Sequence, residues 1–151
     1  DMAVVQGDTT TTMAAALAIG KAIESTGLAA VAADVVVTAC RPFGPWGVLV
    51  GMYLVTLVFT ELVTNNAAAA LAFPLAKATA AALGVSLMPF VIVVAVAASA
   101  GFATPFGYQT HMMVYGPGGY KFGDFVRIGV PLDIIVMIVC VTLTPLFFPF
   151  R

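Results

Sequence analysis

Residues 60–67 read Thr-Glu-Leu-Val-Thr-Asn-Asn-Ala and place a carboxylate and two adjacent amides inside a long apolar tract. Polar side chains are costly in hydrocarbon and are tolerated mostly where they pair or line a path for an ion or solute. Asn65 and Asn66 also stand where one apolar arm ends and the next begins. Transporters use short or broken helices at membrane depth to expose backbone dipoles to a substrate. The stretch therefore indicates a solute path within a membrane protein.

The composition is that of an integral membrane protein. The chain has 151 residues, of which 62% are hydrophobic and 9% charged, whereas about a quarter of a soluble domain is charged. So few charges could not cover the surface of the protein in water. The net charge of -1 offers no basic patch for a nucleic acid. We expect an all-α, multi-pass protein of the cell inner (plasma) membrane, with room for about four or five segments of about 20 residues.

The N-terminal residues 1–12 are atypical of a membrane segment, because the run from Gln6 to Thr12 is mostly polar. We expect this end to be truncated and the chain to be a fragment. Further along, Lys21 and Glu24 are three positions apart, so they share one face of a helix and could pair.

The tract 47–83 predicts a re-entrant helical hairpin. Prolines and a glycine within residues 41–46 interrupt the chain before the tract. Residues 64–66 divide the tract into arms of roughly 15 to 17 residues, below the usual spanning length. Asn65 or Asn66 would cap the second arm and leave its free N–H groups facing the tip. The alternative is two tilted spanning helices joined by an asparagine turn.

Residues 87–120 predict one discontinuous helix. We expect it to unwind near Thr104, because Pro105 removes a backbone hydrogen bond and a glycine follows two positions later. Residues 121–127 then form a short amphipathic linker, and residues 130–148 form the final transmembrane helix.

The hairpin tip and the unwound helix together could bind an ion and a solute. Carbonyl groups freed by unwinding can coordinate a small hard cation, and helix N-termini and side-chain amides can hold an anion. The hydroxyl and amide side chains available for such a site are Thr60, Thr64, Asn65, Asn66, Thr104 and Thr110.

The remaining polar residues leave alternatives open. Glu61 is either an ion ligand or proton carrier, or a structural acid that is hydrogen-bonded to a loop. A lone histidine such as His111 is more often a satisfied polar residue than a proton relay. One histidine with two distant cysteines, Cys40 and Cys140, cannot build a zinc site. The chain also has neither a nucleophile elbow nor a phosphate-binding Walker loop, so we do not expect an enzyme.

Several stretches resemble the C-terminal repeat of the divalent anion–sodium symporters, which are the sodium/sulfate and sodium/dicarboxylate permeases of the ion transporter superfamily. They are TELVTNNAAA at 60–69, AASAGFATPFGYQT at 97–110 and VYGPGGYKFGDF at 114–125, with ALAIGKAIESTG at 16–27 resembling the first helix of the repeat. The resemblance implies that residues 1–151 are a single transmembrane domain, the C-terminal half of a permease with inverted repeats. It implies as partners the N-terminal half, membrane lipid and a second copy in an elevator-type homodimer.

The resemblance also implies site residues. The family's Ser-Asn-Thr hairpin motif falls on Thr64, Asn65 and Asn66, where Asn65 matches fully. The implied substrate-binding residues are Thr64, Asn65, Asn66, Thr104 and Pro105. The implied sodium-binding residues are Thr60, Thr64, Asn65 and Ala103. An asparagine is usual in the closest branch of the family where His111 stands here.

The function expected from this resemblance is secondary active transport of a small divalent or carboxylate-type anion, sulfate or dicarboxylate, coupled to sodium. No catalytic residue and no cofactor other than the sodium ion is expected. One alternative is a proton-coupled anion transporter that uses Glu61 or His111. The other is a membrane subunit or scaffold that transports nothing.

Overall fold

A computed structural model describes residues 11, 14–15, 17–22 and 25–151. The polar residues 1–10 and 12, and Glu24 with its expected pairing to Lys21, lie outside the described residues. The described part of the chain contains helices and no strand. Three of its helices are long and apolar enough to cross a membrane. The prediction of an all-α polytopic membrane protein is therefore confirmed.

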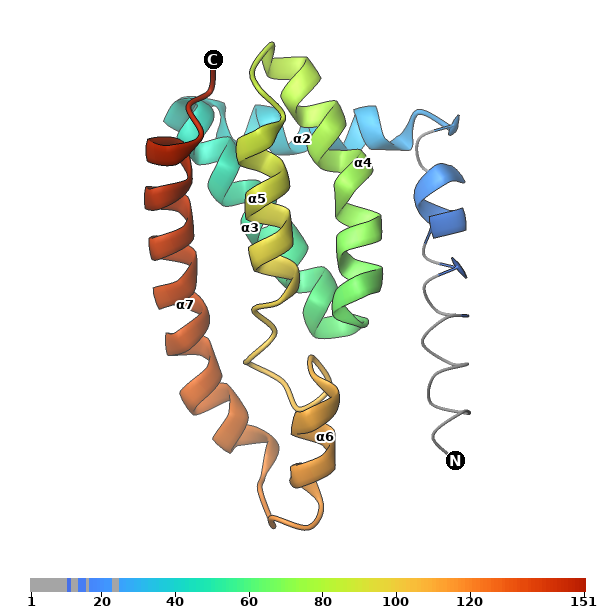
Figure 1. The fold of residues 1–151 in the computed structure, drawn as a ribbon, viewed down its shortest axis with the longest axis vertical. Helices are drawn as coiled ribbons and strands as arrows, with labels where there is room; N and C mark the ends of the chain where they lie inside the picture. The colour runs from blue at the N-terminus through green and yellow to red at the C-terminus, as the bar shows by residue number, and fades with distance from the viewer. Residues whose placement is uncertain (1–10, 12–13, 16, 23–24) are drawn as a thin grey trace.

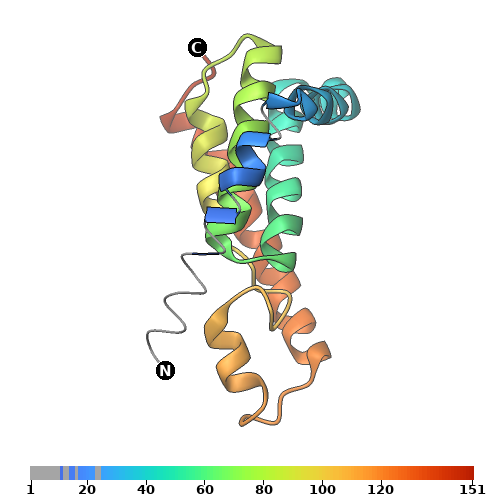
Figure 2. The same cartoon turned by 90° about the vertical axis from the view of Figure 1, so that its right-hand side faces the viewer.

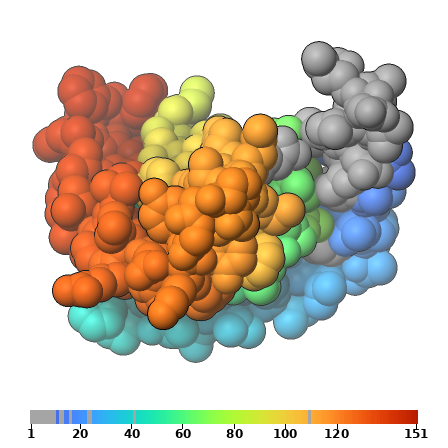
Figure 3. Space-filling view, turned by 90° about the horizontal axis from the view of Figure 1, so that it is seen from below, coloured from blue at the N-terminus to red at the C-terminus, as the bar shows by residue number. Residues whose placement is uncertain are grey.

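The helices form an upright group with one crosswise member. Helices α3, α4 and α5 pack side by side, α7 flanks α5 and α3, and α2 lies across one end and contacts α4 (Figures 1 and 2). The segment around α6 continues beyond the lower end of α5 and covers much of that end of the molecule (Figure 3). The bounds are α2 Leu28–Cys40, the 3-10 turn Arg41–Phe43, α3 Gly44–Leu62, α4 Asn65–Leu83, α5 Met88–Ala98, α6 Gln109–Tyr115 and α7 Phe122–Phe147.

The core lies between α3, α4 and α5. Large side chains from α3 and α5, such as Tyr53 and Phe90, are fully buried there. Helix α4 contributes mainly small residues, with Ala68, Ala72 and Ala76 completely buried at intervals of four. Small residues let helix backbones approach closely, which is the main way that helices pack tightly where no water is present.

The two arms of the predicted hairpin are longer than the sequence indicated. Helices α3 and α4 have 19 residues each, about 28 Å at 1.5 Å per residue. The expected arm length was wrong because α3 begins at Gly44 and holds Pro45 in its first turn, where proline is tolerated. The cap of α4 was also misplaced by one residue, since Thr64 rather than Asn65 or Asn66 is the N-cap.

The break after α5 is wider than the unwinding expected near Thr104. Helix α5 ends at Ala98, and residues 99–108, here named the break segment, are not helical. The Thr60 hydroxyl donates to the Ala98 carbonyl at 2.6 Å. In a continuing helix that carbonyl would accept from Phe102 N–H, which instead donates to Ala100.

Helix α7 begins earlier than the final transmembrane helix expected at 130–148. Residues 122–127 are helical, so they are not the linker that their charges suggested. The Asp124 carboxylate accepts a hydrogen bond from the Lys121 N–H at 2.8 Å. This bond satisfies a donor at the helix start and favours helix formation there. The resulting helix has 26 residues and ends at Phe147.

Helix α7 meets the break segment at a glycine. A Cβ atom on Gly129 would overlap the backbone of Phe102 and would lie 2.7 Å from the Ala103 Cα. The opposing atoms are backbone atoms, so no side-chain rotation can relieve the overlap. Gly129 therefore sets how closely α7 can approach the break segment.

Replacing Gly129 with alanine should destabilise the protein. Overpacking of this kind costs about 1–3 kcal/mol, which exceeds the gain of about 1 kcal/mol from the higher helix propensity of alanine. The matched control is Gly123→Ala in the same helix, because a Cβ there would meet nothing within 4 Å. The thermal unfolding midpoint of the protein purified in detergent should fall for Gly129→Ala alone. Equal midpoints for the two variants would contradict the close approach.

Candidate functional site

Thr60 joins three helix ends. It lies in the last turn of α3 and is fully buried. Its hydroxyl oxygen is 2.6 Å from the Ala98 carbonyl oxygen at the end of α5 and 3.1 Å from Asn65 Oδ1 at the start of α4. One small polar side chain thus connects the tip of the α3–α4 hairpin with the beginning of the break segment.

The Thr60 hydroxyl cannot donate to both oxygen atoms at once, since it carries one proton. The shorter contact, to Ala98, is the better hydrogen bond. The Asn65 amide then has two possible orientations. Its NH₂ group can donate to the Thr60 hydroxyl oxygen, or its Oδ1 can stay near Thr60 and remain available to a ligand. An amide oxygen, a hydroxyl oxygen and a backbone carbonyl are all ligands that hard cations prefer.

The start of α4 presents polar groups at the same tip. Thr64 Oγ1 accepts a hydrogen bond from Ala67 N at 3.4 Å, which orients the first turn of the helix. Asn66 and Thr64 are exposed, whereas Asn65 is half-buried. The unpaired N–H groups of a helix N-terminus carry a partial positive charge that favours an anion nearby.

The break segment folds tightly on itself. A Cβ on Gly107 would lie 2.8 Å from the Gly101 carbonyl oxygen, so the two glycines allow the segment to pack back to back. The Thr104 hydroxyl accepts from Gly107 N at 3.1 Å. A Cβ on Gly107 would also lie 3.2 Å from Glu61 Oε2, and a Cβ on Gly101 would lie 3.4 Å from Thr60 Cγ2. The last turn of α3 therefore packs directly on the break segment.

Glu61 has one satisfied and one free oxygen. Its Oε1 accepts a hydrogen bond from Ala103 N at 3.0 Å, which ties α3 to the break segment. Its Oε2 is buried and has no hydrogen-bond partner. Of the two interpretations left open for Glu61, the bond to Ala103 corresponds to the structural acid, while the second oxygen remains available to a ligand.

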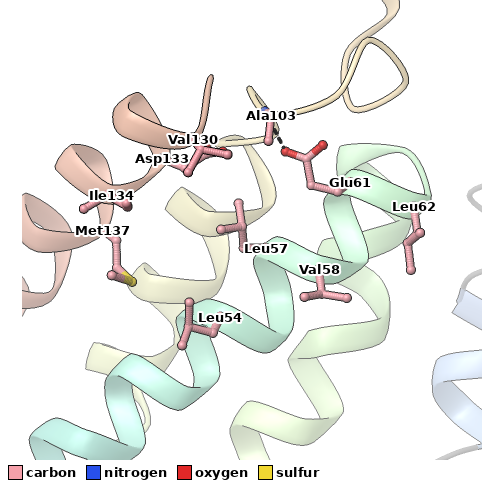
Figure 4. A pocket seen from close by; sticks show the side chains of 10 residues that line it. All are labelled: Leu54, Leu57, Val58, Glu61, Leu62, Ala103, Val130, Asp133, Ile134 and Met137. Carbon is pink, nitrogen blue, oxygen red and sulfur yellow. Dashed lines mark hydrogen bonds between the residues drawn. The ribbon is translucent and has the colours of Figure 1, made fainter. Parts of the chain in front are cut away.

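A cavity of about 280 Å³ opens beside Glu61, between α3, the break segment and α7 (Figure 4). Its polar residues are Glu61 and Asp133, and its other lining residues are apolar. Asp133 was not conspicuous in the sequence, because it lies in the apolar run assigned to the final helix. The signal was present, since an acidic residue within a membrane span usually has a function.

The structure brings together some of the site residues inferred from sequence. Thr60 contacts Asn65, the neighbouring Glu61 accepts from the Ala103 N–H, and Thr64 directly precedes Asn65 as the N-cap of α4. Thr104 is half-buried and already bonded within its own segment. Pro105 is buried within the break segment, and Thr110 is exposed on α6.

His111 packs among aromatic rings. Its ring centroid is 5.5 Å from that of Phe125 and 5.9 Å from that of Tyr108. Its Nδ1 is 3.4 Å from the Thr104 carbonyl oxygen. These contacts attach α6 to α7 and to the break segment, which is a structural role. Within the described residues, no group of three or more His, Cys, Asp or Glu side chains could hold a metal ion.

The sequence from residue 2 to residue 151 matches the family described as the citrate transporter family. The chain belongs to this family.

The chain is also similar to several curated transporters, which supports the family match. The chain is 43% identical over 129 residues to the uncharacterized transporter YfbS of Escherichia coli K12, covering 85% of this chain and 21% of that protein. It is 42% identical over 124 residues to an uncharacterized transporter of Synechocystis, covering 82% and 20%. It is 37% identical over 136 residues to sodium/sulfate cotransporter 1 of Chlamydomonas reinhardtii, covering 89% and 15%. The chain thus spans about a fifth or less of the length of these relatives.

These matches confirm the resemblance to divalent anion–sodium symporter-type permeases. The family match and the three apolar helices together show a membrane protein that belongs to a transporter family. The family is one of transporters.

Removing the Thr60 hydroxyl should loosen the junction of the three helix ends. Thr60→Val keeps the shape of the side chain but leaves the buried Ala98 carbonyl without its donor, which costs about 1–3 kcal/mol. Amide hydrogen exchange in residues 99–108 should accelerate, and the thermal unfolding midpoint should fall.

The matched control is Thr56→Val, one turn earlier in α3. Thr56 is equally buried, but its hydroxyl donates to the Met52 carbonyl of its own helix at 2.8 Å. Its loss should leave exchange in the break segment unchanged. Identical exchange in the two variants would show that Thr60 does not hold this segment.

Proposed function

We propose that this chain forms half of a secondary active transporter of a small anion, sulfate or a dicarboxylate, coupled to sodium and located in the cell inner membrane. The observation that carries the proposal is the junction at Thr60, where a helix N-terminus that carries two asparagine side chains meets the non-helical break segment. Such a junction of broken helices suits an ion and a solute that bind side by side.

The proposed sodium site uses oxygen atoms at this junction. Thr60 and Asn65 contribute a hydroxyl and an amide oxygen, and their 3.1 Å contact supports this assignment. Thr64 is the N-cap of α4, next to Asn65, and Ala103 offers a backbone carbonyl in the break segment. Oxygen ligands of these kinds are typical of hard cations.

The proposed anion site lies at the exposed side of the tip. Thr64 and Asn66 are exposed and Asn65 is half-buried, so their side chains can reach a solute next to the helix N-terminus. Thr104 and Pro105 would border the solute from the break segment. A sodium ion bound first would make the tip electropositive, and the anion would then bind more tightly. This order accounts for coupling without any catalytic residue.

The depth of the hairpin supports a re-entrant arrangement. The cavity at the tip is lined by Glu61 and by Asp133. Asp133 lies eleven residues after Phe122, the first residue of α7, which is about 16 Å along that helix. The hairpin tip therefore meets α7 partway along its length, and α6 extends beyond the tip (Figure 1). A hairpin that ends partway along a spanning helix fits a tip near the membrane centre.

The proposed transporter needs a second half in addition to this chain. Large apolar side chains on α7, such as Ile135 and Ile138, are exposed in this structure. In a membrane they would contact lipid, the N-terminal half of the permease or a second copy. We expect this chain alone not to transport, because the second half of the site would come from the other repeat.

The proposal is tested by uptake into proteoliposomes that contain the protein encoded by the full parent gene. Labelled sulfate, succinate and citrate would be offered with and without an inward sodium gradient. Sodium-dependent uptake of one of them is expected, and Asn65→Ala should abolish it by removing a ligand of both ion and anion. Thr142→Ala is the control, because its hydroxyl is exposed and bonds only within α7.

Other outcomes would favour the alternatives. Uptake driven by a pH gradient and indifferent to sodium would point to proton coupling through Glu61 or His111. A folded protein that takes up no anion under either gradient would point to a membrane subunit or scaffold.

A further inference from the structure

Two carboxylates, those of the buried Asp133 and the half-buried Glu61, border one cavity, and the proposed sodium and anion sites use neither. Glu61 comes from the last turn of α3 and Asp133 from the middle of α7, so they are far apart in sequence. Both line the cavity of about 280 Å³ that separates the two helices (Figure 4). Asp133 also lies against the backbone of Phe102 and Ala103 and within electrostatic range of Glu61.

Each carboxylate has an oxygen atom with nothing to bind. Asp133 is 4% exposed, and its Oδ1 is buried without a hydrogen-bond partner. Glu61 Oε2 is buried without a partner as well. Buried polar atoms are nearly always hydrogen-bonded, so orphaned oxygens on two carboxylates that border one cavity require an explanation.

Backbone groups of Phe102 and Ala103 stabilise these carboxylates only in part, and no basic side chain lines the cavity. Ten residues line it, of which two are acidic and none is basic. An uncompensated charge in a low-dielectric interior costs several kcal/mol. The cost is greater for two like charges that face each other. Neutral residues in place of Glu61 and Asp133 would avoid this electrostatic cost.

The Phe102 carbonyl oxygen is a further possible ligand for a cation. The Phe102 carbonyl packs against Gly129, which is one turn before Asp133 on the same face of α7. Carboxylate and carbonyl oxygens are the ligands preferred by small hard cations, whereas soft metals prefer sulfur or imidazole.

We propose that Glu61 and Asp133 bind a small hard metal cation between α3 and α7, at a site separate from the one at Thr60 and Asn65. A cation there would satisfy both orphaned oxygens and reduce the repulsion between the carboxylates. It would also link the hairpin tip to α7 across the cavity. The inference rests on the proposed function only for its place in transport, because cation binding can be measured without any uptake.

The experiment measures cation-dependent stability of the protein encoded by the full parent gene, purified in detergent. The thermal unfolding midpoint would be followed as NaCl replaces choline chloride at constant ionic strength, with separate titrations of CaCl₂ and MgCl₂. A ligand that binds only the folded state raises the midpoint as its concentration rises. The titrations distinguish a monovalent from a divalent occupant.

An Asn65→Ala background isolates the new site, because that substitution impairs the site at the hairpin tip. Cation-dependent stabilisation should persist in Asn65→Ala and be lost when Asp133→Asn is added. Loss of an outer-shell partner already weakens metal binding about 10- to 100-fold. The midpoint cation concentration should therefore rise at least about tenfold for Asp133→Asn alone. Glu61→Gln should act likewise while its amide oxygen still accepts from Ala103 N.

Asp34→Asn is the matched control, since Asp34 is exposed on α2. It should leave the titration unchanged. The inference is overturned if Asp133→Asn and Glu61→Gln titrate like the wild type. It is also overturned if they are more stable than the wild type and indifferent to cations, which would show a pair of protonated acids. Neither result bears on whether Asn65→Ala abolishes uptake, so the two proposals fail separately.

Discussion

The arrangement of this protein depends on the hydrogen bond from the Thr60 hydroxyl to the Ala98 carbonyl. That bond occupies the acceptor that would otherwise extend α5, and α5 ends at this residue. It thereby fixes where the break segment starts. The same side chain contacts Asn65, so the start of α4 is set against the end of α5. A substitution that kept the volume but lost the hydroxyl would change the backbone as well as the polarity of the tip.

Hydrogen bonds to non-helical backbone groups are especially important in a membrane protein. Backbone groups released from a helix find no water in hydrocarbon, so they must be satisfied by the protein itself. Here Glu61 accepts from Ala103 N and Thr104 accepts from Gly107 N. Gly101, Gly107 and Gly129 then let the non-helical backbone pack closely against itself and against α7. The break is therefore supported on several sides, although it is irregular.

The sequence predicted the features that depend on the residue types within a short stretch. It missed the features that depend on contacts between segments. The polar residues 60–67 correctly marked the turn between two helices, because amides and hydroxyls in an apolar tract are conspicuous. Proline misled at the start of α3, where Pro45 begins a helix rather than ending one. Charges misled at residues 122–127, because the bond between Lys121 and Asp124 that starts α7 is not evident from charge alone. Asp133 could be placed opposite Glu61 only once the two helices were seen together.

The alanine face of α4 has a consequence for how stability is distributed. Ordering an alanine side chain costs no rotamer entropy, whereas ordering a long side chain costs up to about 2 kcal/mol. Ala68, Ala72 and Ala76 are fully buried, so α4 packs by close backbone contact with little entropic cost. The helix shaft is thus held largely by van der Waals contact. Apart from the Thr64 cap and the contact between Asn65 and Thr60, the hydrogen-bonding capacity of the polar residues at its start remains free for ligands.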